Sequence, residues 1–291
     1  MSTPEAITRD QFRFFERLRV RWVEVDLQKI VFNGHYLMYF DTAVAGYWRA
    51  LALPYHDTMA ALAGDLFVRK ATVEYAASAR YDEMLDVGVK TARVGTSSMT
   101  LACAVFRGEQ LLVSGELVYV FANPDTQTSQ PVPAALRAVL TAFEAGEPVL
   151  DVQVGSWDQL GSAASALRTA VFVQEQGIPA DMEWDAADAH CVHAVATNRM
   201  GQALATGRLL QHAPGVGRIG RMAVMASMRG SRIGRQVLEA LAQAARQRGD
   251  HQVILHAQAS AAAFYQRAGF VAQGEPFVEA GIPHIEMARQ P

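Results

Sequence analysis

The chain has 291 residues, of which 51% are apolar and 19% charged, and its formal net charge at pH 7 is −3. This composition is globular, and the length favours two cores rather than one oversized domain. Basic residues do not gather into a long stripe, which argues against nucleic-acid binding. No apolar run approaches the roughly 18 residues that a membrane-spanning helix needs, and the first ten residues lack a signal peptide's hydrophobic stretch. We therefore expect a cytoplasmic protein, and we expect Cys103 and Cys191 to be buried thiols.

Turn-forming residues punctuate the middle of the chain. A polar, proline-containing stretch runs from Asn123 to Pro133, and Gly146, Glu147 and Pro148 follow a short amphipathic segment. The two halves do not resemble one another, so no internal repeat is expected. We place the domains at residues 12–146 and 150–291.

The first half predicts one strand, one long helix and four further strands. Residues 17–26 alternate like a strand. A helical face then collects Tyr36, Phe40, Ala43, Tyr47 and Leu51. The later strand-like runs, separated by turn residues, cover 67–77, 84–95, 98–108 and 110–122. This order predicts an antiparallel sheet wrapped on a central helix, an α+β fold.

The second half predicts a mixed α/β domain. Helical spacing covers 162–177 and 233–249, and a shorter helix is expected in 260–270. Strand patterns cover 191–198, 201–212, 218–225 and 252–258, the first two as a hairpin.

A carboxylate and a helix start lie close together in the first half. Asp26 is expected just past a strand, and Asn33 follows seven residues later, where the central helix is expected to begin. Free N–H groups at a helix start can hold a thioester carbonyl oxygen while the carboxylate attacks it or activates water. On spacing alone, the favoured interpretation is that Asp26 is a turn residue and Asn33 a helix cap.

The run VRWVEVDLQKIVFNGHYLMYFDTA, together with VRKATVEYAASARYDEMLDV, resembles the hotdog-fold acyl-CoA thioesterases of the hydroxybenzoyl-CoA thioesterase and YbgC type. The resemblance covers almost all of residues 12–145. It implies that Asp26 is the catalytic carboxylate, acting as nucleophile or base, and that a backbone N–H near Asn33 and Gly34 polarises the carbonyl. It also implies a homo-oligomer, a dimer or tetramer, with sites between subunits.

The sequence departs from this pattern at three positions. Lys29 replaces the usual glycine of the turn, Asn33 stands where histidine or tyrosine is frequent, and Ser78 replaces proline. His35 is a candidate for assistance by hydrogen bonding, or is a packed or capping residue. Further candidates for contacts with CoA phosphates, or solvated surface cations, are Arg69, Lys70 and Arg80.

A strand, a glycine-containing turn and a helix in the second half form a candidate phosphate cradle. Backbone N–H groups from Gly230 through Arg235 can approach a diphosphate, and the helix start adds positive potential. The cations in and beside this turn are Arg229, Arg232 and Arg235.

This cradle and the later AQASAAAFYQRAGF segment resemble the GNAT N-acetyltransferases, and the runs LRTAVFVQEQGIPADMEWDAAD and EAGIPHIEMAR are similar to the ElaA-like branch. The resemblance spans residues 152–289. It implies direct acetyl transfer from acetyl-CoA, the co-substrate, to an amine that the sequence does not identify. It assigns thiolate protonation to Tyr265, which is otherwise a core aromatic residue. It assigns CoA contacts to Met222, Ala223, Val224, Arg229, Gly230, Ser231, Arg232, Ile233, Gly234, Arg235 and Gln258.

The general base of such a transfer is open at this level. Glu175, Glu183 and His193 are candidates by residue type only. A metal site built from Asp185, Asp188, His190, Cys191 and His193 is rejected, because the resemblance places this stretch in an ordinary strand.

The leading hypothesis is a bifunctional enzyme, an acyl-CoA thioesterase joined to an acetyltransferase. Two alternatives stay open. In one, the second domain is a noncatalytic CoA-binding module that regulates the hydrolase. In the other, the first domain is a noncatalytic scaffold that oligomerises the acetyltransferase. The replacement of the usual glycine by Lys29 is the feature that favours this alternative.

Overall fold

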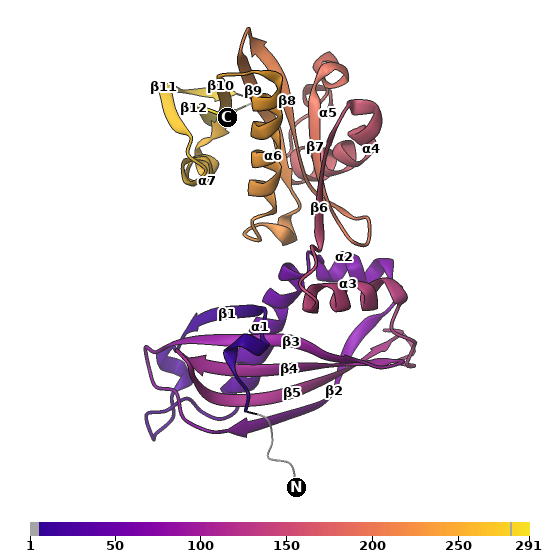
Figure 1. Cartoon of the computed structure of the whole chain (residues 1–291), viewed down its shortest axis with the longest axis vertical. Helices are drawn as coiled ribbons and strands as arrows, with labels where there is room; N and C mark the ends of the chain where they lie inside the picture. The colour runs from indigo at the N-terminus through magenta and orange to yellow at the C-terminus, as the bar shows by residue number, and fades with distance from the viewer. Residues whose placement is uncertain (1–5, 280) are drawn as a thin grey trace. The chain divides into compact units, whose positions relative to one another are not determined.

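The computed structural model describes residues 6–279 and 281–291 (Figure 1). The chain divides into two compact units, one ending at Val149 and the next starting at Leu150. Within the described residues, no helix is long and apolar enough to cross a membrane.

The first unit is a five-stranded antiparallel sheet with three helices. Its elements are β1 (Phe14–Arg19), α1 (His35–Ala50), α2 (Tyr55–Ala61), β2 (Asp65–Tyr75), β3 (Met84–Val94), β4 (Ser98–Arg107), β5 (Gln110–Ala122) and α3 (Ala134–Glu144). The strand order is β1-β3-β4-β5-β2, so β2 forms one edge.

Helix α1 is the centre of the first core. Phe40 and Tyr47 are completely buried on its inner face. The helix comes close to β5 because Gly115 has no side chain there: a Cβ at Gly115 would lie 2.7 Å from the ring of Phe40. A sheet wrapped on a central helix is the hotdog arrangement, so the predicted fold of this half is confirmed.

Two predictions for the first half were wrong in detail. The expected strand over 17–26 ends at Arg19, and Trp22–Glu24 form a 3₁₀ turn instead. The buried carboxylate of Glu24 accepts from the backbone N and from Nε of Arg21, both at 2.7 Å, and this local pairing competes with strand pairing. Helix α2 was not predicted, because its seven residues are too few to show a clear helical period.

The second unit is a seven-stranded mixed sheet with helices. Its elements are β6 (Leu150–Gly155), α4 (Trp157–Arg168), a π-helical turn (Thr169–Glu175), α5 (Ala180–Glu183), a 3₁₀ turn (Ala186–His190), β7 (Val192–Asn198), β8 (Ala203–Ala213), β9 (Val216–Val224), α6 (Ile233–Arg248), β10 (Gln252–Gln258), α7 (Ala262–Arg267), β11 (Val271–Glu279) and β12 (Ile282–Arg289).

The strand order of this sheet is β11-β12-β10-β9-β8-β7-β6, and among these neighbours only β9 and β10 are parallel. Helix α6 provides the crossover between them and buries its apolar face, which includes Val237 and Leu241, on the central strands. The predicted mixed sheet flanked by helices is confirmed.

The second half differs from the sequence-based expectation in its strands and in its first helix. Strands β6, β11 and β12 were not predicted. The helix expected over 162–177 starts at Trp157 and changes to a π-helical turn at Thr169. Ser156 starts the helix early, because its backbone N donates to the side chain of Gln159 at 3.0 Å in a capping box.

Candidate functional site

Asp26 lies in a tight hairpin that returns the chain to the start of α1. Val25 and Val31 form an antiparallel bridge, and the N–H of Phe32 donates to the carbonyl of Glu24 at 2.9 Å. The half-buried Asp26 carboxylate accepts from the N–H of Gln28 at 2.8 Å, as in an Asx turn. The hairpin therefore fixes the position of the Asp26 carboxylate, and the chain then leads directly to the start of α1 at His35.

Lys29 holds a left-handed conformation at the tip of this hairpin. Its φ is +62°, and its N–H donates to the carbonyl of Asp26 at 3.0 Å. This backbone region favours glycine, which explains why a glycine is the usual residue of the turn. The lysine keeps the turn at a cost in backbone energy.

The start of α1 has two backbone N–H groups that are available as hydrogen-bond donors. The N–H groups of Asn33 and Gly34 have no acceptor within the described residues, whereas the N–H of His35 donates to the carbonyl of Phe32 at 2.9 Å. Tyr75 fixes this entrance by donating its hydroxyl to the carbonyl of Asn33 at 3.1 Å. The ring of His35 packs edge-on against Phe32. Two amides can therefore hold an oxyanion, while the His35 ring packs on an aromatic neighbour.

The second unit contains a wedge between β9 and β10. The two parallel strands are in register for only three residue pairs, and the last pairs Arg218 with Ile254. Beyond that point β9 continues to Val224 and β10 to Gln258, without register between them over the described residues. The backbone of Met222 and Ala223 on the side facing β10 is therefore open to an extended ligand, whereas the carbonyl of Val224 accepts from Nε of Arg229 at 3.2 Å.

The turn after β9 forms the start of α6. Gly230 and Arg232 both adopt the left-handed region, with φ of +86° and +66°. Among the described residues, no acceptor pairs with the N–H groups of Gly230, Arg232, Ile233 and Gly234. The N–H groups of Ser231 and Arg235 are used inside the turn, bonded to Met228 and Arg232 respectively. Four free amides at a helix start form a site for an anion.

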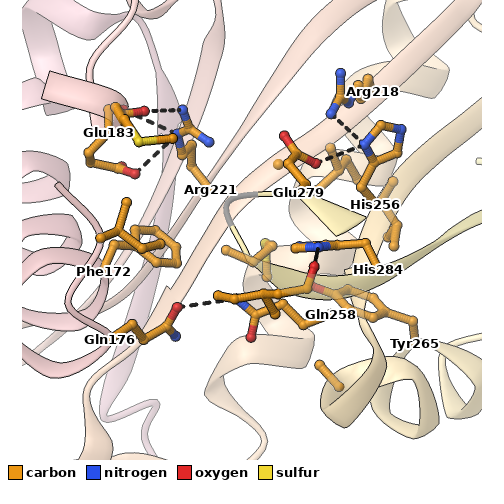
Figure 2. A pocket seen from close by; sticks show the side chains of 18 residues that line it. Phe172, Gln176, Glu183, Arg218, Arg221, His256, Gln258, Tyr265, Glu279 and His284 are labelled. Carbon is orange, nitrogen blue, oxygen red and sulfur yellow. Dashed lines mark hydrogen bonds and ion pairs between the residues drawn. The ribbon is translucent and has the colours of Figure 1, made fainter. Parts of the chain in front are cut away.

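A cavity of about 260 Å³ opens in the wedge (Figure 2). Met222 of β9, Gln258 of β10 and Tyr265 of α7 line it. Burial raises the pKa of Tyr265 to about 12, so the phenol keeps its proton at neutral pH. The Tyr265 hydroxyl has no hydrogen-bond partner among the side chains and backbone that the structure describes. Gln258 donates to Gln176 at 3.1 Å and so joins β10 to the π-helical turn.

Comparison with known proteins identifies both units. The family model described as acetyltransferase (GNAT) domain matches residues 164–291, and that of the thioesterase superfamily matches residues 28–114. Protein ElaA of Escherichia coli K12 is 36% identical over 130 residues, which are 43% of this chain and 83% of ElaA. The chain belongs to the GNAT acetyltransferase family. Its first unit is a thioesterase-superfamily domain.

Solved structures of both kinds are similar to this chain. An acyl-CoA N-acyltransferase from Pseudomonas aeruginosa is 40% identical, with a TM-score of 0.44, over 48% of this chain and 99% of its own. A thioesterase-superfamily protein from Jannaschia sp. CCS1 is 22% identical, with a TM-score of 0.44, over 47% of this chain and 96% of its own.

The three base candidates of the GNAT unit have other partners. Glu175 accepts from both terminal nitrogens of Arg229 at 2.6 and 2.7 Å. Glu183 lines the cavity, but it is buried and bonded to Nε of Arg168 at 2.5 Å. His193 is buried, outside the cavity lining, and bonded through Nε2 to the carbonyl of Asp188 at 2.8 Å. Burial lowers the pKa of His193.

The acidic residues of the rejected metal site pair with arginines. Asp185 and Asp188 both bind Arg208, at 2.6 and 2.7 Å, and Asp188 also binds Arg168 at 2.8 Å. No group of three metal-binding side chains occurs in the described part of the chain. The carboxylates of the metal site considered from the sequence therefore form ion pairs with arginine side chains.

Sequence reasoning missed a second set of polar residues in the GNAT cavity. These are Arg218, Arg221, His256, Glu279 and His284. The last two strands supply two of these residues, Glu279 from β11 and His284 from β12. Because β12 pairs antiparallel with β10, His284 lies opposite Gln258. Strand alternation in 282–289 was the available signal, but it does not reveal which strand is the neighbour.

Proposed function

We propose that both units act on acyl-CoA thioesters, the first by hydrolysis and the second by acetyl transfer to an amine. The observation that carries the proposal is the wedge of the GNAT unit. It leads from four free amides at the start of α6, along the backbone of β9, to the hydroxyl of Tyr265. A CoA thioester has a diphosphate, a pantetheine arm and a sulfur in that order.

In the GNAT unit, Gly230, Arg232, Ile233 and Gly234 bind the diphosphate through their N–H groups. The charges of Arg229, Arg232 and Arg235 add to this site, and Ser231 stabilises the turn through its hydroxyl bond to Met228. The pantetheine arm lies along Met222–Val224. Tyr265 donates its proton to the departing thiolate, and its raised pKa means that the phenol is protonated at neutral pH.

In the thioesterase unit, Asp26 attacks the thioester carbonyl or activates water. The N–H groups of Asn33 and Gly34 stabilise the oxyanion, and one such donor is worth about 3 kcal/mol in the transition state. The bond from Gln28 orients the carboxylate, and His35 shapes the entrance of the site by packing on Phe32.

A second copy of the thioesterase unit completes this site in our proposal. Large apolar side chains stand exposed around the hairpin, with Trp22 at 75% and Leu27 at 102% exposure. Strand β2 is an edge, and its Val68 is 55% exposed. Burying such side chains and pairing such an edge are what homo-oligomers do. Arg69, Lys70 and Arg80 are exposed and free to meet CoA phosphates.

The test separates the two chemistries by their need for an amine. Thiol release from acyl-CoAs of short, long and aromatic type is followed with and without a panel of amines. We expect amine-independent release to disappear in Asp26→Asn and amine-dependent release to fall in Tyr265→Phe. Asp57→Asn and Tyr81→Phe, both at exposed positions, are the matched controls.

The two alternatives predict different results. A GNAT unit that only binds CoA gives no amine-dependent release, yet CoA binding changes the rate of hydrolysis. A scaffold without hydrolase activity leaves all acyl-CoAs intact in the absence of amine. Either result would refute the bifunctional proposal for the corresponding unit.

A further inference from the structure

The GNAT cavity contains two imidazoles that none of the roles above uses. His256 of β10 and His284 of β12 both line it. Figure 2 shows Gln258, Tyr265 and His284 gathered on one side of the cavity, with Glu183 and Arg221 on the other. This inference rests on the proposed acetyl transfer and concerns the group that accepts the proton of the amine.

An alkylamine is an ammonium ion at neutral pH and must lose a proton before it attacks a thioester. The base needs a lone pair that faces the cavity and is free of other donors. Glu183 fails this requirement, because Arg168 at 2.5 Å and Arg221 at 3.4 Å both share its carboxylate.

His256 fails it as well. Its Nδ1 lies 2.8 Å from a terminal nitrogen of Arg218 and 3.2 Å from Oε2 of Glu279, so this nitrogen is engaged either as an acceptor from the arginine or as a donor to the carboxylate. Its Nε2 faces the carboxylate of Glu286 at 3.5 Å, which favours a proton on that nitrogen. Neither nitrogen of His256 is left as a free acceptor.

His284 has the opposite arrangement. Its Nδ1 lies 2.8 Å from the carbonyl of Ile282, and a carbonyl can only accept, so Nδ1 carries the hydrogen. In the neutral ring Nε2 is then the bare nitrogen. The structure describes no hydrogen-bond partner for this atom. The bond to the backbone thus fixes the tautomer that a base needs.

The fold also holds the His284 ring in place beside the reacting centre. His284 is the register partner of Gln258, the last residue of β10, at the open end of the wedge. Phe277 of β11 stacks on the ring with 5.9 Å between centroids and an angle of 22°. Stacking and the Ile282 bond together restrict the rotation of the imidazole.

We propose that Nε2 of His284 is the general base of the acetyl transfer. It takes one proton from the acceptor ammonium, and the neutral amine forms a C–N bond to the acetyl carbon. Collapse of the tetrahedral intermediate breaks the C–S bond, and the thiolate takes the Tyr265 proton. The nitrogen then loses a second proton to the Tyr265 phenolate, which restores the hydroxyl. His284 releases its proton to solvent. One proton is released in each turnover.

The charged groups of this wall lie on three strands. Glu279 of β11 interacts with the His284 imidazole, whereas Glu286 of β12 and Arg218 of β9 pair with His256. Tyr265 of α7 and His256 of β10 also line this part of the cavity. The carboxylate of Glu279 is therefore placed to stabilise the charge that the ring gains during the transfer.

The test compares His284→Asn with wild type. An asparagine amide can still donate to Ile282, as Nδ1 does, but it offers no base at the place of Nε2. With the panel amine that reacts fastest, we expect kcat/KM at pH 7 to fall about 100-fold in the variant. The variant should also become more steeply dependent on pH than wild type, losing about tenfold in kcat/KM per pH unit below the pKa of the amine, because only the free amine then reacts. His251→Gln, at an exposed position outside the cavity lining, is the control.

A second acceptor separates a base from a structural role. The hydrazide analogue of the same amine is already neutral at pH 7 and needs no base for its first proton. The kcat/KM of His284→Asn with the hydrazide should stay within about threefold of the wild-type value, because this acceptor does not need a base. Equal losses with both acceptors would overturn the proposal.

Nitrogen NMR of the holoprotein with CoA gives a readout that does not depend on any acceptor. We expect the neutral His284 ring to carry its hydrogen on Nδ1. A hydrogen on Nε2 would refute the inference even if transfer occurs. Conversely, a wild-type protein that transfers acetyl to no panel amine contradicts the proposed function, while the NMR result still decides the tautomer.

Discussion

Arg229 holds the carboxylate of Glu175 through two hydrogen bonds of 2.6 and 2.7 Å, and so ties the π-helical turn to the phosphate cradle. The same guanidinium is a proposed contact for the CoA diphosphate. Hydrogen bonding to Arg229 lowers the pKa of Glu175, so the carboxylate stays charged and competes with the phosphate for Arg229.

This competition predicts opposite effects for the two partners. Arg229→Ala should weaken CoA binding and Glu175→Gln should strengthen it, each by about fivefold, since a charged contact at an exposed position is worth about 1 kcal/mol. Calorimetric titration with CoA at two salt concentrations measures both. Arg246→Ala, at the far end of α6, is the control. Weaker binding by both variants would mean that the pair positions the turn rather than competing with the ligand.

Arg168 is the centre of a buried ion network in the GNAT unit. It is 1% exposed, and its guanidinium binds Glu183 at 2.5 Å and Asp188 at 2.8 Å. Arg168→Met leaves two buried carboxylates short of a partner, so we expect a loss of about 3–5 kcal/mol in the free energy of unfolding of this unit. Urea unfolding followed by tryptophan fluorescence measures it, with Arg246→Met as the exposed control. A loss below about 1 kcal/mol would show that Arg208 and Arg221 replace the missing charge.

Asp185 gives this network a pH dependence. Its hydrogen bond from Arg208 lowers the pKa of the carboxyl from an ordinary 3.8 to about 2. A lowered pKa contributes stability in full above the ordinary value, and this stability is lost as pH falls from about 4 to about 2. Allowing for the exposure of Asp185, the contribution is about 1 kcal/mol.

Unfolding by urea at pH 7 and at pH 3 tests this expectation. The difference in unfolding free energy between the two pH values should be smaller in Asp185→Asn than in wild type. Asp181→Asn, an exposed residue of the same segment, should leave the difference as it is. An unchanged difference in Asp185→Asn would mean that other carboxylates dominate the acid response.

Lys29 and its strained turn supply a prediction for the thioesterase unit. Because its φ is +62°, Lys29→Gly relieves a left-handed conformation that costs about 1–2 kcal/mol, less the entropy that glycine adds to the unfolded chain. We expect a net gain of up to about 1 kcal/mol in stability, while Lys29→Ala stays near wild type. Thermal unfolding compares the three proteins. A gain in the alanine variant equal to that of glycine would assign the effect to the lysine charge.

Much of the architecture followed from local patterns. The apolar spacing of Phe40 and Tyr47 predicted a buried α1, and the strand runs of the first half predicted β2 to β5 close to their observed bounds. The pattern failed where a side chain competes with it: Glu24 bonds to its own chain through Arg21 and ends the expected strand early. Helix α2 and strand β6 are too short for a period to stand out.

The sequence by itself determined two units, because turn residues, strand alternation and helical spacing are properties of a few consecutive residues. Its resemblance to two families then supplied the family of each unit and the turns at Lys29 and Arg232. Only the tertiary structure decided which polar side chains meet in the GNAT cavity. His284 lies beside Gln258 because β12 pairs with β10, and Glu175 and Glu183 are removed as bases because Arg229 and Arg168 reach them. Partners far apart in the chain are set by strand pairing and ion pairing, and no local pattern encodes them.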